Sequence, residues 1–186
     1  LFSVFQAAGG PAARAAPLPP SESIVYGPGS AIAPKTNGNI EDQTVGFITV
    51  AGVRHRALFS AIGYSQTYGM DLVVFDLETG QIVKTHRVQG VAGSYSMFFV
   101  YDGNLYFCTY SKARLYKYDT TAVDSPPVQL AELTADGYSY GCLQGPDQAQ
   151  ANDPSTKDSD FKAVYFNGTY TGHLYRYTDA LGLEDL

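Results

Sequence analysis

Four side chains in the second half of the chain are of the types that proton transfer next to a carboxylate requires. Lyases that cut uronate polymers remove the proton beside a carboxylate, so they need a cation to neutralise the acid and a Tyr or His to carry the proton. The residues that supply these types are His173, Tyr170, Lys112 and Arg114. They define one hypothesis, a polysaccharide lyase. A surface that binds its ligand without catalysis is the alternative.

The second chemical feature is an excess of tyrosine. The chain has 15 Tyr and 10 Phe but no Trp. A tyrosine offers a flat face for stacking and a phenol that donates or accepts a hydrogen bond, which suits the flat patches and hydroxyls of a sugar. The candidate ligand-binding residues, all expected near strand ends, are Tyr64, Tyr68, Tyr95, Tyr110, Tyr138 and Tyr140. Packing inside the fold is the competing explanation for each of them.

Other chemistry finds little support in the sequence. Cys108 and Cys142 are the only cysteines, and they are consistent with one disulfide or with two buried thiols. Two cysteines without a paired His spacing are too few for a zinc site. The sequence contains neither a Gly-rich phosphate loop nor the Gly-x-Ser-x-Gly pattern of a hydrolase. We therefore expect no metal and no cofactor.

Composition narrows the class of protein. The chain has 186 residues, 45% of them apolar and 16% charged, which is typical of one globular domain or a little more. A net charge of −6 disfavours a general nucleic-acid binder. No apolar run reaches the roughly 18 residues of a membrane span. We expect neither nucleic acid nor membrane among the partners.

An internal repeat predicts the architecture. Three segments share an apolar strand, a short gap and a Leu followed by alternating aromatics, anchored on Leu72, Leu115 and Leu174. The first two anchors are 43 residues apart and the last two 59, and the polar stretch 144–160 accounts for the difference. A repeat near 43 lies in the roughly 40–45 residues of a four-stranded propeller blade. The predicted strands are 45–51, 57–62, 72–76 and 81–88, then 95–101, 104–110, 114–119 and 128–133, then 138–143, 163–167 and 173–177, with at most a frayed strand after them.

The expected fold is therefore all-β, a partial β-propeller of about three four-stranded antiparallel blades within residues 21–186. The blades are predicted at 45–88, 94–133 and 138–186, with the polar insert 144–160. Closed propellers have typically 4–8 blades, so we expect the missing blades of the same parent chain as partners. Residues 1–20 run from apolar to small residues to Pro, which indicates a leader remnant or a flexible arm.

Blade topology gathers the candidate residues on one face. Strands in a blade run antiparallel in order, so the loops between blades and the loops after each second strand emerge together. These loops hold the candidate tyrosines and cations but only one acid, Asp136. Arg grips carboxylates or sulfates in two places at once, so this face is suited to a carbohydrate-like and anionic ligand.

Three segments resemble secreted β-propellers of the quinoprotein-like and polysaccharide-lyase-like type, namely 71–85, 93–119 and 172–179. The chain departs from such proteins in having no Trp, so neither the tryptophan-docking motif nor a Trp-Asp strand end is present. The resemblance implies a secreted or cell-surface module and assigns no catalytic residue. Three functions follow as hypotheses: binding of an anionic carbohydrate, a polysaccharide lyase, and a structural or protein-interaction propeller.

Overall fold

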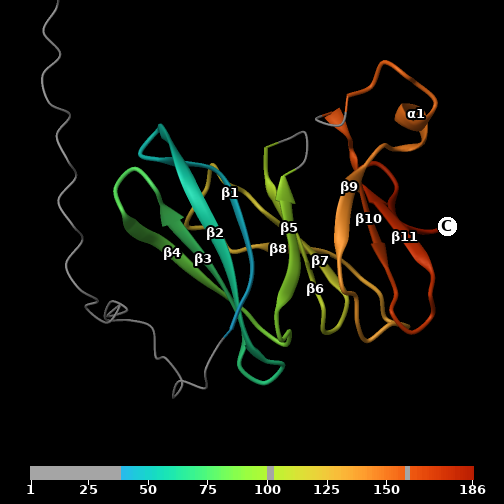
Figure 1. The fold of residues 1–186 in the computed structure, drawn as a ribbon, viewed down its shortest axis with the longest axis horizontal. Coiled ribbons are helices and arrows are strands. Elements are labelled where there is room, and N and C mark those ends of the chain that lie inside the picture. Colours follow the sequence, from blue (N-terminus) through green and yellow to red (C-terminus); the bar gives the residue numbers. More distant parts are fainter. Residues whose placement is uncertain (1–38, 100–102, 158–159) are drawn as a thin grey trace, which may run out of the picture. The chain divides into compact units, whose positions relative to one another are not determined.

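The computed structural model describes residues 39–99, 103–157 and 160–186 (Figure 1). The arm predicted over 1–20 lies outside this part. The described residues form three four-stranded antiparallel sheets, each built from four strands in chain order. The all-β prediction and its three four-stranded antiparallel units are confirmed.

The first sheet contains the longest strands. It is formed by β1 (Asn39–Val50), β2 (Val53–Ser65), β3 (Gly69–Asp76) and β4 (Gln81–Val88). Ala51 and Gly52 connect β1 to β2 in a two-residue hairpin with φ angles of 50° and 79°. Positive φ at both positions matches the twist of the flanking strands, and Gly adopts it without steric cost.

The second sheet is formed by β5 (Ser94–Phe99), β6 (Leu105–Thr109), β7 (Arg114–Tyr118) and β8 (Val128–Glu132). The third is formed by β9 (Cys142–Gly145), β10 (Ala163–Asn167), β11 (Leu174–Thr178) and β12 (Gly182–Asp185). β6 is buried along its whole length, which explains its continuous apolar sequence.

Several strand ends differ from the prediction. β1 begins at Asn39 and not at 45. Two acids near its start, Glu41 and Asp42, interrupt the alternation of apolar and polar residues by which the strand was predicted. β9 begins at Cys142 and not at 138, because Tyr138 forms a single bridge to Ser111 instead of pairing along β10. The insert predicted over 144–160 starts inside β9 and contains a short helix, α1 (Gln148–Ala151). β12 is a paired fourth strand.

Two hydrophobic cores join the sheets in sequence. The first core packs Phe59 and Leu72 of the first sheet with Phe107 and Tyr118 of the second. The second core packs Leu115 of the second sheet with residues of the third, namely Cys142, Val164, Phe166 and Tyr175. Each sheet thus buries a face that it could not bury alone. The first strands of successive sheets also meet, since β1 contacts β5 and β5 contacts β9.

A disulfide reinforces the second junction. Cys108 in β6 and Cys142 in β9 are bonded, with their Cα atoms 6.0 Å apart. The sequence was consistent with one disulfide or with two buried thiols, and the structure has the disulfide. The second and third sheets are therefore linked covalently as well as by their shared core.

Candidate functional site

Three β-bulges lie near one end of the first and second sheets. In each, one residue is inserted without a partner in the neighbouring strand: Glu41 in β1, Tyr64 in β2 and Tyr95 in β5. A bulge turns the inserted side chain away from the regular alternation and is frequent next to functional sites. The side chain of Tyr64 lies outside the described part of the structure, so its predicted role in binding is not placed.

Five tyrosines, here called the tyrosine row, contact one another in series. Tyr95 stacks on Tyr110 with ring centroids 4.8 Å apart and on Tyr140 at 6.3 Å. Tyr110 stacks on Tyr138 at 6.4 Å, and Tyr138 meets the edge of Tyr170 at 5.5 Å. The structure therefore brings together four of the six candidate ligand-binding tyrosines and one candidate for proton transfer.

The tyrosine row is open to solvent at several members. Tyr140 is 61% exposed, Tyr170 is 71% exposed and Tyr95 is 45% exposed, whereas Tyr110 and Tyr138 between them are half-buried. Large apolar rings are seldom left this exposed in a contiguous group without a binding role. The row thus offers two free ring surfaces at its ends and phenol groups between them.

Backbone hydrogen bonds hold the loops that carry the row. The amide of Lys112 donates to the carbonyl of Gly137 at 2.6 Å, and the amide of Ser139 donates to the carbonyl of Tyr110 at 3.0 Å. The amide of Thr169 donates to the carbonyl of Tyr138 at 3.1 Å. The loops of the second and third sheets that carry the row are therefore held together by backbone hydrogen bonds.

Asp136 anchors the loop of Tyr170. Its buried carboxylate accepts hydrogen bonds from the amides of Tyr170 and Thr171, at 3.0 and 2.9 Å, and from the hydroxyl of Thr171 at 2.6 Å. The hydroxyl bond is the main cause that lowers the pKa of Asp136, and burial opposes it. The one acid that the sequence placed on this face positions a loop.

The candidate cations differ in what they contact. Arg114 donates from Nε to Glu132 at 2.8 Å and is only 18% exposed at its side chain. His173 bonds Asp185 through Nδ1 at 2.8 Å. Lys112 is exposed and makes no ion pair within residues 39–99, 103–157 and 160–186.

Tyr68, the sixth candidate tyrosine, lies in the turn between β2 and β3 and is 38% exposed. Its carbonyl accepts a hydrogen bond from Nη1 of Arg87 at 2.5 Å, and Arg87 also pairs with Asp71. The backbone of Tyr68 is therefore fixed by the first sheet itself.

Glu41 is the residue of this site that the sequence analysis missed. Its carboxyl group occupies a slot between Gly63 and Gly93, where a Cβ on either glycine would collide with it. The amide of Ser94 donates to this carboxyl, but burial outweighs that bond and raises the pKa of Glu41. Its Oε2 is buried with no hydrogen-bond partner in the described structure. Two glycines and an acid, far apart in sequence, give little local signal of such a slot.

Glu41 acts electrostatically on the tyrosine row. Burial raises the pKa of Tyr95 and of Tyr110, and in both the charge of Glu41 is the next cause. A shallow, open depression adjoins Tyr95 and is lined by residues of β1, β5 and β9, among them Asp42, Met97 and Leu143. Burial raises the pKa of Asp42, although the amides of Gln43 and Met97 oppose the shift.

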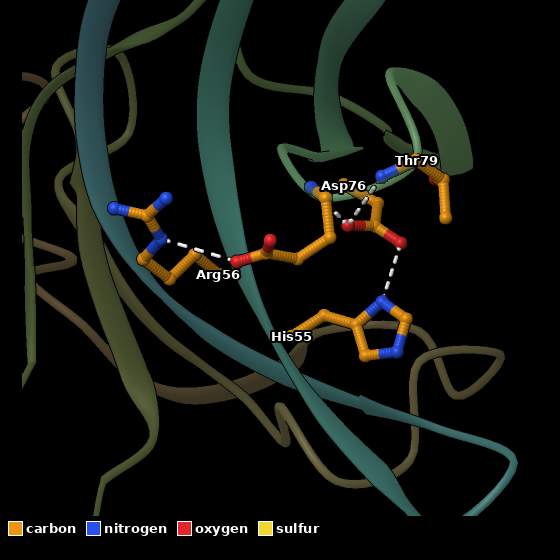
Figure 2. A network of polar contacts seen from close by, with 5 residues as sticks. His55, Arg56, Asp76 and Thr79 are labelled. Carbon is orange, nitrogen blue, oxygen red and sulfur yellow. Dashed lines mark hydrogen bonds and ion pairs between the residues drawn. The ribbon is translucent and has the colours of Figure 1, made fainter. Parts of the chain in front are cut away.

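Residues 54–56 have the basic sequence Arg-His-Arg, and His55 and Arg56 make contacts within the first sheet and its turn. Figure 2 shows His55 and Asp76 pointing toward each other, with Nδ1 of His55 2.7 Å from Oδ2 of Asp76. Burial opposes ionisation of Asp76, but the bonds from His55 and from the amides of Glu78 and Thr79 lower its pKa to about 2. Arg56 pairs with Glu78 in the same turn. These contacts hold the turn between β3 and β4 against β2.

Acids of the polar insert also serve local structure. Asp147 caps α1 by accepting from the amide of Gln150 at 2.8 Å, and Asp153 accepts from the amide of Ser155 at 2.9 Å. Within the described residues no three His, Cys, Asp or Glu side chains are grouped as metal ligands would be. No helix in that part of the chain is long and apolar enough to cross a membrane.

Comparisons with protein families, with curated proteins and with solved structures found no match to this chain.

Proposed function

We propose that the chain is part of a β-propeller whose tyrosine row binds a carbohydrate. The propeller is supported by three sheets of identical strand order, joined by successive cores, with contacts between the first strands of neighbouring sheets. Blades that radiate from a common axis bring their first strands closest together. The disulfide supports secretion, because such bonds persist in oxidising compartments.

The tyrosine row is the observation that carries the ligand class. Sugars present flat apolar patches edged by hydroxyls, and an exposed tyrosine meets both with its ring and its phenol. Tyr140 and Tyr170 are the most exposed members and lie at the two ends of the row. A ligand that spans the row would contact both ends, which favours an oligosaccharide over a single sugar.

No observation favours catalysis over binding. Two of the four candidates for lyase chemistry are engaged within their own sheets, Arg114 with Glu132 and His173 with Asp185. Packing between sheets, the competing role of the tyrosines, accounts for the half-buried members of the row. It does not account for 61% and 71% exposure at the ends.

The proposal is tested by calorimetric titration of the chain with hexasaccharides of four kinds: glucose, N-acetylglucosamine, glucosamine and galacturonate. We expect saturable binding of at least one. Replacing Tyr140 or Tyr170 by Ala should weaken that binding by about 2- to 12-fold each, because one aromatic contact contributes roughly 0.5–1.5 kcal/mol. The uronate hexamer tests the anionic ligand that the sequence predicted.

A matched control separates binding from general damage. Leu181→Ala removes a side chain that is 65% exposed and takes no part in the row, so its affinity should equal that of the parent chain. The proposal is wrong if none of the four hexamers binds, or if the Tyr140 and Tyr170 variants bind as well as Leu181→Ala does.

A further inference from the structure

We propose that Asn167 is an N-glycosylation site whose glycan lies on the outer face of the third sheet, the face turned away from the second sheet. The inference goes beyond the proposed function, and carbohydrate binding by the tyrosine row does not depend on it. The co-reactant is an oligosaccharide linked to a polyprenyl pyrophosphate, which a transferase of the secretory pathway uses.

The acceptor pattern occurs once in the chain. N-linked glycans are attached to Asn in the pattern Asn-x-Ser/Thr, where x is not Pro. Residues 167–169 are Asn-Gly-Thr, and no other Asn of the sequence begins this pattern. The disulfide is typical of the oxidising compartments in which the modification takes place. A three-residue pattern also arises by chance, so its place in the fold decides what it means.

The local backbone does not account for this asparagine. Asn167 is the last residue of β10 and pairs with Leu174 of β11. In the turn that follows, Gly172 supplies the positive φ of 72°, and Gly168 fits so closely against the carboxylate of Asp136 that a Cβ would collide with it. Asn is depleted in strands, so its presence at a paired strand position calls for another explanation.

Comparison with the second sheet shows which way Asn167 faces. Asn167 pairs with Leu174 as Cys108 pairs with Leu115, so the two residues hold the same position in the repeat. Cys108 is bonded to the third sheet. Phe166, which precedes Asn167, packs in the second core, so Asn167 points to the outer face. Where the second sheet has a residue bonded to the next sheet, the third has an exposed asparagine.

The polar insert covers one part of this outer face. Tyr165 and its partner Arg176 share the face with Asn167, because alternate residues of a strand point to the same side. The hydroxyl of Tyr165 donates to a carbonyl of the insert at 2.7 Å, and Nη1 of Arg176 donates to Oε1 of Gln148 at 3.4 Å. Arg176 also pairs with Glu184 and is only 8% exposed. The chain itself thus occupies this part of the face.

The remaining part of the face is apolar and open. Leu174 lies directly opposite Asn167, which places their Cβ atoms about 4.5–5.5 Å apart. Leu143, opposite Tyr165, is 61% exposed, Leu174 is 47% exposed and Leu186, which bonds the carbonyl of Leu174, is 58% exposed. Grouped exposed apolar side chains mark a surface that another molecule covers.

A glycan is the occupant that these observations favour. Its first sugar, attached to Asn167, would lie beside Leu174 with an apolar face on the leucines and its hydroxyls in water. A further blade is the competing occupant. It would have to bury the amide of Asn167 at a cost, and the insert over Arg176 already takes part of the surface that it would need. The proposed propeller is then open on this side.

The modification forms one bond and breaks one. Nδ2 of Asn167 attacks the anomeric carbon of the first sugar and loses a proton. The bond from that carbon to the pyrophosphate oxygen breaks, and the polyprenyl pyrophosphate leaves with the bonding electron pair. Nothing is oxidised or reduced. Thr169, whose side chain is exposed, supplies the hydroxyl that the pattern requires.

The test is expression of the full chain behind a cleavable secretion leader in insect cells. Secreted chain and chain retained by the cells are both weighed by mass spectrometry before and after treatment with peptide-N-glycosidase. We expect one N-glycan on the parent chain, whose removal converts Asn167 to Asp. The glycan should be lost in Asn167→Gln and in Thr169→Ala, and kept in Thr169→Ser, which retains the hydroxyl.

The matched control is Asn152→Gln, which changes an exposed asparagine that lies outside the pattern and should leave the glycan in place. A second measurement locates the glycan in the folded chain, where NMR should show contacts between the first sugar and the methyl groups of Leu174. The inference is overturned if the parent chain carries no N-glycan, if Asn167→Gln keeps it, or if only chain without the disulfide carries it. Contacts of the sugar with no leucine of this face would also overturn it.

Discussion

Reduction of the Cys108–Cys142 disulfide should lower the free energy of unfolding of the chain by about 4 kcal/mol. The bond joins residues 34 positions apart and so closes a loop of that size in the unfolded chain. The chain-entropy relation for a loop of this length gives about 3.8 kcal/mol at 25 °C. Reduction lowers the stability by giving the unfolded chain more conformational freedom. The folded state changes little, because both cysteines remain within the second core.

The magnitude is measurable by urea unfolding of the oxidised and reduced chain at pH 7. Tyrosine fluorescence and far-ultraviolet circular dichroism follow the transition, since the chain has no Trp. A loss of about 4 kcal/mol would shift the midpoint by roughly 1.3–4 M urea, given slopes of about 1–3 kcal/mol per M.

The double variant Cys108→Ala/Cys142→Ala provides the control for the reducing agent. It should unfold at lower urea concentration than the parent chain and should not respond to reductant. The reasoning is refuted if reduction lowers the free energy of unfolding of the parent chain by less than about 1 kcal/mol. That result would mean that the unfolded chain already holds these residues together.

Three further predictions follow from the cores and the loops. Phe59→Ala should lower the free energy of unfolding by about 3–5 kcal/mol in urea titration, because Phe59 is fully buried in the first core. Burial lowers the pKa of His86 from 6.5, and its Nε2 bonds the carbonyl of Val123. The unfolded chain therefore takes up this proton first, and stability should fall as the pH drops below 6.5, by at most about 1.4 kcal/mol per pH unit. His86→Gln should remove that part of the decline, which urea titrations from pH 7 to 5 would detect. Asp136→Ala should speed amide hydrogen exchange at Tyr170 by at least about tenfold, as measured by NMR or mass spectrometry, while leaving β6 protected. Unchanged exchange at Tyr170 would show that the loop is held by other contacts.

Much of the fold follows from short-range patterns in the sequence. The continuous apolar sequence of β6 reflects burial on both faces, so the apolar run identifies this strand. The start of β1 was missed because acids at Glu41 and Asp42 interrupt the apolar alternation at a bulge. A bulge adds a residue without changing composition, and only the pairing of the strands reveals it.

The site was predictable in part. The expected strand order grouped Tyr95, Tyr110, Tyr138 and Tyr140 at one end of successive sheets, and the rings of these four residues lie in contact in the structure. The partners of the cations were not predictable, since Arg114 and Glu132 meet only through the register of β7 with β8. The slot that holds Glu41 depends on Gly63 in β2 and Gly93 just before β5, which lie far apart in the sequence, so no local pattern encodes it.

The disulfide also determines how the chain responds to force. A pull on the two ends passes through the bond between β6 and β9 and cannot extend the residues between them. An extended residue spans at most about 3.3–3.6 Å, so the 34-residue loop corresponds to roughly 110–120 Å of chain length. This length cannot be extended until the bond is reduced. The first sheet lacks such a bond within the described residues, so its hairpins are the ones available to lengthen first. Stretching should thus separate the molecule into an extensible part and a covalently locked part that holds most of the tyrosine row.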